Sequence, residues 1–424
     1  MSGDAAQRLG VQFAKLWAAS TTSALGSGLT TIAVPLLIAS RTRDPLVVSA
    51  AFGVAWLPWL LFALPGGVLV DRVDRRRLMI VIDWSRVAAV GVLAAAIAAD
   101  RASIGVLYAV IFLVNTGEVV FRSASQAMIQ AVVPRVRLER ANGWLAGGAT
   151  LSQGGLAGPL GGFLFVVAAS APFFVNACTY AASAVLIGLV AGTYRPSPAA
   201  AAGDGGPRRV RPVRAEIAEG LRWLLRQRML RTMAVLIGLL NLTLVAAISV
   251  LVLLARERLG LGSVGYGLLF TCEAAGLFLG SVFGDRIIKR VTATWTIRVG
   301  LLVEAGTHLV LATARSGSVV AIALFAFGMH GALWTIVSNS LLQRLTPPAM
   351  LGRVVSSTLF IAAGGNCVGA LLGGVIASSF GLTAPYWAGF VVAILVSAAT
   401  WRVFNRATVA QAYAEPPPAP APAA

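Results

Sequence analysis

The chain has 424 residues, of which 58% are hydrophobic and only 12% are charged, and its mean hydropathy is +0.82. This composition excludes an ordinary soluble domain, in which about 25% of the residues are charged, and it indicates an all-α polytopic membrane protein. The net charge of +18 does not indicate nucleic-acid binding, because most basic residues lie in short loops between apolar runs. The three cysteines lie in apolar stretches, which excludes a disulfide framework and a cysteine zinc site.

Twelve apolar segments are long enough to cross a membrane. The hydrocarbon core is about 30 Å thick, so a crossing helix needs about 20 mainly apolar residues. The predicted helices cover residues 14–39, 46–69, 78–99, 103–126, 143–168, 171–193, 231–254, 265–284, 293–313, 318–341, 355–379 and 384–404. The first segment lacks the basic cluster and cleavage site of a signal peptide, so we expect it to be the first helix of the mature protein.

The basic residues predict the orientation of these helices. If the N-terminus is inside, 25 of the 34 Lys and Arg residues fall in inner segments, 6 fall in outer loops, and the other three lie within predicted helices. Loops rich in Lys and Arg stay on the cytoplasmic side of a membrane. We therefore expect both termini in the cytoplasm.

Two segments are expected outside the membrane. Residues 194–230 form a long cytoplasmic linker, and its second part, Val213–Arg228, has the pattern of an amphipathic helix. Such a helix is expected to lie at the anionic inner surface of the membrane. Residues 406–424 form a Pro- and Ala-rich tail that is expected to be disordered.

An internal repeat divides the chain. A shift of 214 residues places residues 66–76 on residues 280–290, and a shift of 213 places residues 130–140 on residues 343–353. The repeat predicts two parallel six-helix halves, residues 1–193 and 231–405. Two such halves joined by a long cytoplasmic loop are the architecture of major facilitator transporters.

Closely spaced glycine, aspartate and arginine residues end the second predicted helix and begin the loop that follows it. They resemble the G-x-x-x-D-R-x-x-R-R signature of the major facilitator superfamily, which by resemblance is a cytoplasmic latch that closes the inner gate. The aspartate suits the positive N-terminal end of a neighbouring helix, and the arginines can reach carboxylates or helix C-termini. This loop motif and its second copy comprise Gly66, Asp71, Arg72, Arg75, Arg76, Gly280, Asp285, Arg286 and Arg290. The alternative interpretation is a basic inner loop with one stray acid.

A glycine-rich stretch in the fifth predicted helix matches the motif G-x-x-x-G-P-x-x-G-G. By resemblance this motif is typical of exporters that exchange drug-like substrates for protons. Its residues are Gly154, Gly158, Pro159, Gly161 and Gly162. The glycines offer a smooth packing face and the proline is expected to kink the helix. The alternative is generic small-residue packing.

Further stretches resemble one branch of the superfamily, that of enterobactin-type siderophore exporters and macrolide efflux pumps. They are Ile32–Leu36, Asp71–Arg76, Leu138–Asn142 and Glu219–Arg222. The resemblance implies a monomeric multi-pass protein of the bacterial cytoplasmic membrane, with small-molecule substrates, protons and lipid as partners, no nucleic acid and no cofactor beyond a proton gradient. One departure concerns Ser27, because members of this branch often carry an acid at that position.

Several ionisable residues fall within predicted helices. Each costs roughly 2.5–3.5 kcal/mol at bilayer depth unless a partner or an aqueous cavity compensates. By resemblance to the fold, the helices that line the central cavity carry four candidates for proton coupling: Glu118, Arg122, Glu273 and His330. Asp83, Arg86 and Glu304 fall on outer helices and are expected to form structural pairs.

Glu118 is the first choice for the proton carrier. Arg122 follows it at i+4, the favourable order for a helical ion pair, so we expect Arg122 to tune its protonation; the alternative is a permanently satisfied pair. Aromatic residues on the cavity-lining helices are candidates for contact with a large amphipathic substrate, although most are expected to pack against lipid or other helices. These candidates are Trp17, Trp56, Trp59, Phe270 and Trp334, with Phe278 and Phe360.

The leading hypothesis is a proton-coupled exporter of small amphipathic molecules that works by alternating access. One alternative is an importer or facilitator of a small metabolite on the same fold. A second is a lipid flippase or a membrane sensor without solute turnover. An enzyme has little support, because no phosphate-binding loop, metal-ligand cluster or nucleophile cluster is visible.

Overall fold

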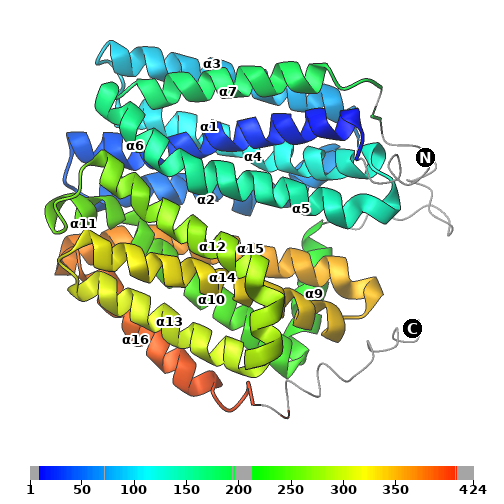
Figure 1. Cartoon of the computed structure of the whole chain (residues 1–424), viewed down its shortest axis with the longest axis vertical. Coiled ribbons are helices and arrows are strands. Elements are labelled where there is room, and N and C mark those ends of the chain that lie inside the picture. The colour runs from blue at the N-terminus through cyan, green and yellow to red at the C-terminus, as the bar shows by residue number, and fades with distance from the viewer. Residues whose placement is uncertain (1–8, 71, 193, 196–212, 406, 408–424) are drawn as a thin grey trace. The chain divides into compact units, whose positions relative to one another are not determined.

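The computed structural model describes residues 9–70, 72–192, 194–195, 213–405 and 407. Its contacts divide the chain into two compact units (Figure 1). The N-terminal unit comprises residues 1–38 and 57–210, and the C-terminal unit comprises residues 39–56 and 211–424. The start of the second helix therefore groups with the C-terminal unit, where Gly53 packs against Leu371, whereas the sequence repeat assigned that whole helix to the first half.

The first six spans are formed by α1 to α7. The helices are α1 (Val11–Arg41), α2 (Pro45–Val70), α3 (Arg75–Ala98), α4 (Ile104–Val132), α5 (Leu138–Ala149), α6 (Ala157–Val167) and α7 (Ala171–Gly188). The fifth span consists of α5, a π-helical segment at Thr150–Leu156, and α6. The packed core of this unit includes Leu16, Met79, Ala124 and Met128.

The remaining chain begins with the linker helix α9 (Val213–Arg226). The helices that follow are α10 (Arg228–Ser249), α11 (Leu251–Glu257), α12 (Ser263–Val291), α13 (Ala293–Thr313), α14 (Gly317–Leu345), α15 (Pro348–Phe380) and α16 (Ala384–Thr400). Within the unit, α12 runs beside α14, α10 beside α15, and α13 beside α16 (Figure 1).

Among the described residues, eleven helices are long and apolar enough to cross a membrane, and α16 is a shorter apolar helix. Together they correspond to the twelve predicted segments. Several helices extend beyond the predicted ends; α12, for example, continues past residue 284 through Asp285 and Lys289 to Val291. The predicted segment ended at residue 284 because hydropathy detects only the apolar part of a helix. Backbone hydrogen bonding continues the helix into polar turns beyond that part.

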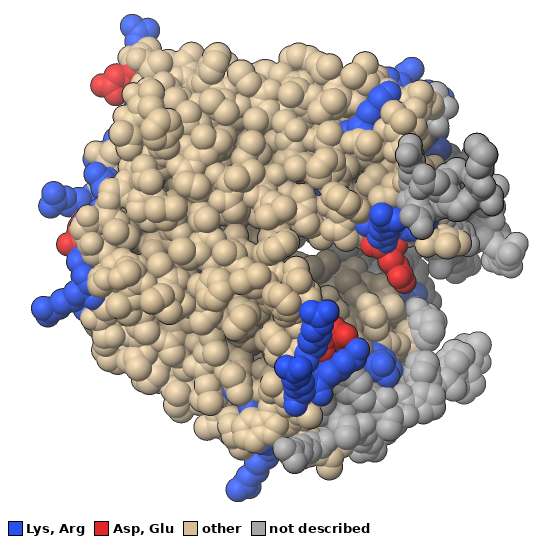
Figure 2. Space-filling view, in the orientation of Figure 1, with Lys and Arg blue, Asp and Glu red and all other residues tan. Residues whose placement is uncertain are grey.

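The surface of the helices suits a lipid environment. Large apolar side chains such as Phe163, Phe174 and Leu395 are more than half exposed. On the face shown in Figure 2, the charged side chains gather towards the helix ends and the surface over the helix middles is largely uncharged. In lipid, exposed apolar side chains need no further cover.

The linker helix α9 packs against α15 within the C-terminal unit. Leu224 is buried in the core, and Arg353 Nη1 lies 2.7 Å from Glu219 Oε1. A Cβ on Gly220 would lie 2.5 Å from the carbonyl oxygen of Arg353, so only glycine permits this close approach. The helix begins where the amphipathic pattern predicts, but one of its sides contacts protein.

Gly220→Ala is expected to release α9 from α15, because the added Cβ would meet backbone that cannot move aside. Hydrogen exchange measured by mass spectrometry should become faster in residues 218–226 and stay unchanged in α3. Gly352→Ala is the matched control, because no atom of a described residue beyond its own helix lies within 4 Å of a Cβ at Gly352. Equal exchange in the two variants would contradict the close contact.

Candidate functional site

A buried polar cluster lies in the N-terminal unit, where α1, α3, α4 and α7 meet. Its centre is Arg86 on α3, whose side chain has no exposed surface. Gly117 on α4 leaves room for it, since a Cβ there would lie 2.8 Å from Arg86 Nε. The rings of Tyr180 and Phe121 flank the guanidinium, with centroids 4.9 and 5.5 Å from its Cζ.

The guanidinium of Arg86 binds two carboxylates. Nη2 lies 2.7 Å from Glu118 Oε2, and Nη1 lies 3.4 Å from Asp83 Oδ1. Nε donates to the carbonyl oxygen of Val114 at 3.3 Å, and Nη1 contacts Ser23 Oγ at 3.5 Å. Bonds from several helices therefore hold the cation, as a charge within a membrane requires.

Helices α1 and α7 add two hydroxyl groups to this cluster. Ser27 Oγ donates to Glu118 Oε2 at 3.2 Å and lies 3.1 Å from the Tyr180 hydroxyl. Ser27 is the residue that sequence analysis singled out as a departure from the pattern of the resembled branch. Here the serine joins the carboxylate of Glu118 to the tyrosine through hydrogen bonds.

The cluster contains one more acid than base. With all groups ionised, Asp83 and Glu118 against Arg86 leave one uncompensated negative charge. Asp83 has no exposed side-chain surface, and its Oδ2 has no hydrogen-bond partner in the part of the chain that the structure describes. The Glu118 side chain is 20% exposed. An excess buried carboxylate is costly, and the binding of one proton would make the cluster neutral. Of the two carboxylates, Glu118 is the one with exposed surface through which a proton can reach it.

The predicted partner of Glu118 was wrong. The exposed Arg122 lies over the ring of Trp59, with its Cζ 5.5 Å from the centroid, and the guanidinium that binds Glu118 belongs to Arg86. Helical spacing indicates only which side chains are neighbours along one helix, whereas this contact joins α3 and α4. Arg86 was predicted to form a structural pair outside the site, and it lies at its centre.

The first copy of the loop motif binds helix ends. Asp71 lies outside the described residues, and Arg72 is exposed. Arg75 Nη1 lies 3.4 Å from the carbonyl oxygen of Ala127 on α4. Arg76 donates to the carbonyl oxygens of Ile187 and Gly188, where its charge complements the C-terminus of α7.

Asp74 was not assigned a role from the sequence. It caps the start of α3 by accepting from the backbone N–H of Arg77 at 3.0 Å, and its other oxygen accepts from Tyr194 N–H at 3.2 Å. An aspartate before an Arg-rich helical turn is a helix-start signal, so the sequence contained the information for this cap.

The second copy of the loop motif lies at the end of α12. Asp285 Oδ2 pairs with Lys289 Nζ at 2.6 Å, with both side chains largely exposed. Arg286 and Arg290 line a surface pocket with four apolar residues. Gly280 permits close packing of α12 on α14, because a Cβ there would lie 2.5 Å from the carbonyl oxygen of Met329.

The glycine-rich motif spans the junction between the π-helical segment and α6. Gly154 lies in the π-helical segment, and Pro159 lies in the first turn of α6. Gly158, Gly161 and Gly162 are buried, and a Cβ on Gly161 would lie 3.3 Å from Ile32 Cβ on α1. The motif therefore packs the fifth span against the first.

Glu273 and His330 lie in the C-terminal unit. His330 is 8% exposed, its imidazole packs directly against Gly300 of α13, and its ring lies 6.5 Å from that of Trp334. Glu273 is partly buried where α12 packs against Gly328 of α14. Both residues interact electrostatically with Glu304, which sequence analysis set aside as structural.

The aromatic candidates take part in separate contacts. Trp17 Nε1 donates to the carbonyl oxygen of Trp144 at 2.9 Å. The ring of Trp59 lies under the guanidinium of Arg122. Phe270 packs edge-on against Tyr266, with ring centroids 5.2 Å apart. Trp56 belongs to the C-terminal unit. Each aromatic side chain with such a contact has a packing role within its own unit. Within the described ranges, no three His, Cys, Asp or Glu residues could together hold a metal ion.

A model of the transmembrane secretion effector family matches residues 6–422. The chain belongs to this family. Its members are transporters of the major facilitator superfamily and not enzymes, which confirms the resemblance drawn from the loop motif and the glycine-rich motif. The protein is a multi-pass membrane protein.

Curated relatives match much of the chain at low identity. The enterobactin exporter EntS of Shigella boydii is 24% identical over 405 residues, covering 90% of this chain and 89% of that protein. The multidrug efflux pump Tap of Mycolicibacterium fortuitum is 26% identical over 400 residues, covering 87% and 90%. Macrolide efflux protein A of Streptococcus pyogenes is 28% identical over 134 residues, and the chain spans 33% of its length.

Solved structures share the fold. A bacterial homologue of the iron transporter ferroportin has a TM-score of 0.73 at 15% identity, covering 94% of this chain and 100% of that chain. The nucleoside transporter NupG has a TM-score of 0.69 at 10% identity, covering 93% and 99%. These matches confirm the twelve-helix major facilitator fold.

Proposed function

We propose that the protein exports small amphipathic molecules from the bacterial cytoplasm by proton antiport, with alternating exposure of its transport site to the two sides of the membrane. Three relatives support the direction, since their names describe an enterobactin exporter, a multidrug efflux pump and a macrolide efflux protein. The observation that carries the proton step is the buried cluster of Arg86, Asp83 and Glu118, in which one acid is in excess.

Glu118 is the residue that exchanges the proton in this proposal. When Glu118 is ionised, Arg86 and Ser27 stabilise it through the contacts described above. When it is protonated, Arg86 keeps its bond to Asp83 and the cluster is neutral. When the proton leaves, the excess negative charge falls on Glu118, which is bonded to Arg86 and Ser27 and is 20% exposed. It therefore costs less there than on Asp83, whose side chain has no exposed surface.

The remaining parts of the proposal concern topology and assembly. Both termini lie in the cytoplasm, as the excess of Lys and Arg in alternate loops indicates. The loop motif then lies on the cytoplasmic side and acts in closing the inner gate. The chain acts as a monomer in the bacterial cytoplasmic membrane, and the proton gradient supplies the energy.

Glu118→Gln is expected to abolish gradient-driven transport, because the amide keeps a hydrogen-bonding oxygen but binds no proton. The measurement is uptake of radiolabelled erythromycin and of ethidium into energised everted membrane vesicles. When a protonophore is added, wild-type uptake should fall to the level of vesicles that lack the protein. Vesicles with Glu118→Gln should give the same low uptake without the protonophore. Glu257→Gln changes an exposed carboxylate at the end of α11 and should transport normally.

Gradient-driven uptake by Glu118→Gln would remove this residue from the mechanism. Wild-type uptake that is indifferent to the protonophore would refute proton antiport. Accumulation of a nutrient in intact cells, with no erythromycin or ethidium transport, would favour a metabolite importer. Lipid movement in reconstituted vesicles without solute flux would favour a flippase.

A further inference from the structure

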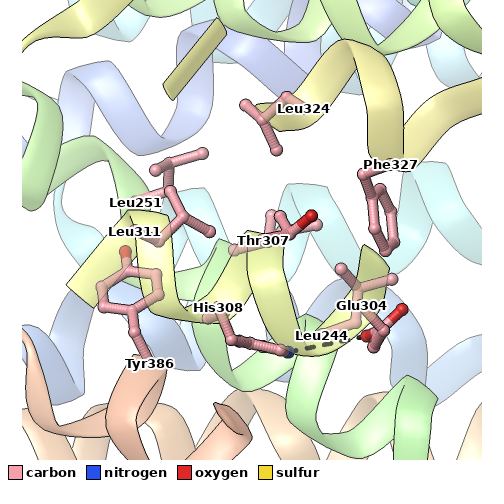
Figure 3. Close-up of a pocket in the computed structure, with 11 residues that line it drawn as sticks. Leu244, Leu251, Glu304, Thr307, His308, Leu311, Leu324, Phe327 and Tyr386 are labelled. Atoms are coloured by element: carbon pink, nitrogen blue, oxygen red, sulfur yellow. Dashed lines mark ion pairs between the residues drawn. The ribbon is translucent and has the colours of Figure 1, made fainter. Parts of the chain in front are cut away.

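A second polar cluster lies inside the C-terminal unit, between α13, α14, α16 and the α10–α11 region. Figure 3 shows Glu304, Thr307 and His308 on α13 and Tyr386 on α16 around a small cavity. The cavity volume is about 10 Å³, which is close to the space that one water molecule requires. The other walls are apolar, formed by residues that include Leu244, Leu251, Leu324 and Phe327.

The polar side chains of this cluster are almost fully buried. Glu304 is 4% exposed, His308 is 2% exposed and Tyr386 has no exposed surface. Glu304 Oε1 lies 3.5 Å from His308 Nε2. Among the described residues, neither atom has a hydrogen-bond partner, nor does His308 Nδ1 or the Tyr386 hydroxyl. The helix α16 fixes the imidazole, because a Cβ on Gly389 would lie 2.5 Å from its Nδ1.

The elements around α13 supply few compensating charges. Helix α12 contributes Glu273 and α14 contributes His330, both of which interact electrostatically with Glu304. Helix α16 contributes the neutral Tyr386, and the α10–α11 wall is apolar. On α13 itself, Arg298 points its Nη2 at the carbonyl oxygen of Trp401, 2.8 Å away, and so is engaged elsewhere.

We propose that Glu304 and His308 form a second proton-binding site, in which the pair shares one proton. An ionised glutamate beside a neutral imidazole leaves a buried negative charge, and no hydrogen bond from a described residue to Oε1 stabilises it. Such a charge is costly. One added proton makes the pair neutral, either as a carboxylic acid beside imidazole or as a carboxylate beside imidazolium. The cavity gives a water molecule access to the pair, with Tyr386 as a further partner.

The third helix of each half therefore carries a buried acid–base pair, Asp83 with Arg86 on α3 and Glu304 with His308 on α13, each beside a tyrosine of the sixth helix. The first pair contains a guanidinium, which is a permanent cation, whereas the second contains an imidazole, which is a base in its neutral form. Only a role of this second site in the transport cycle rests on the proposed function. The binding of a proton by Glu304 and His308 is independent of it.

The test is infrared difference spectroscopy of the purified full-length protein in detergent, between mildly acidic and mildly alkaline buffer. The wild type should show carboxyl or imidazole bands that change with pH, and Glu304→Gln should remove one carboxyl component. His308→Gln should keep a glutamate signal but shift the pH at which it changes. Glu257→Gln, which removes an exposed carboxylate, should lose only a solvent-like component.

Melting temperatures close to that of the wild type would show that the variants are folded. A Glu304→Gln spectrum that matches the wild type, or a glutamate signal that His308→Gln leaves unshifted, would overturn the shared-proton site. Erythromycin uptake into vesicles is then measured separately. If transport proves not to be proton-coupled while the Glu304 signal titrates as described, the proposed function fails and this site stands.

Discussion

Replacement of Arg86 by methionine is expected to destabilise the protein by about 3–5 kcal/mol, the cost of breaking a buried ion pair by removing one partner. Methionine fills much of the same space but leaves Asp83 and Glu118 without their common cation. The measurement is thermal unfolding of the purified protein in detergent, followed by tryptophan fluorescence. The yield of folded protein in the membrane should fall in parallel.

Arg122→Met is the matched control for this change. Arg122 is exposed and its contact with the Trp59 ring is worth about 0.5–1 kcal/mol at such a site. The variant Arg86→Met with Asp83→Asn and Glu118→Gln should recover much of the lost stability, because no buried charge remains. If Arg86→Met melts like Arg122→Met, or if the neutral triple variant gains nothing, electrostatic pairing does not hold this cluster together.

Gly276→Val is expected to destabilise the C-terminal unit by about 3 kcal/mol, at the upper end of the usual cost of overpacking. A Cβ at Gly276 would overlap the carbonyl oxygen of Phe325 and lie 2.9 Å from the backbone nitrogen of Met329. Gly328 of α14 meets the carbonyl oxygen of Glu273 in the same way. Backbone atoms in two packed helices cannot rotate away, so α12 and α14 must separate.

Thermal unfolding and vesicle transport measure this effect together. Gly331→Ala on α14 is the control, because a Cβ at Gly331 would have no neighbouring helix within 4 Å in the described ranges. It should be neutral or stabilising by up to roughly 1 kcal/mol, as alanine favours helix more than glycine does. A Gly276→Val protein as stable as Gly331→Ala would show that α12 and α14 are not in backbone contact there.

The positions of the helices could be predicted because hydropathy is a local property of the sequence. The partner of Glu118 could not be predicted in the same way. The i,i+4 rule directed attention to Arg122, whereas Arg86 and Ser27 contact Glu118 from two other helices. Tyr180, on a third helix, joins them through Ser27. One signal in the sequence pointed to Arg86. An arginine at membrane depth needs partners, and Asp83 alone cannot accept from all the N–H groups of its guanidinium, so a second acceptor on another helix was to be expected.

The resemblance to a family supplied what spacing could not, namely the fold and the two motifs. It was less informative about individual charges, since it assigned α3 and α13 to outer positions. Both helices carry buried ionisable groups that face neighbours in their own unit. Packing on the outside of a central cavity does not prevent a helix from directing polar side chains inward.

The π-helical segment at Thr150–Leu156 changes how the fifth span meets the first. A Cβ on Gly148 would lie 2.5 Å from Thr21 Oγ1, and a Cβ on Gly28 would lie 2.5 Å from Ala157 Cβ, so residues 148 and 157 both turn towards α1. In a regular α-helix, with about 100° of rotation per residue, these two positions would point in opposite directions. The π-helical turns contain more residues, so each residue rotates the chain by less, and positions 148 and 157 come to face the same way. The fifth span can therefore contact α1 along one face, although a helical wheel of its sequence would place these contact residues on two opposite faces.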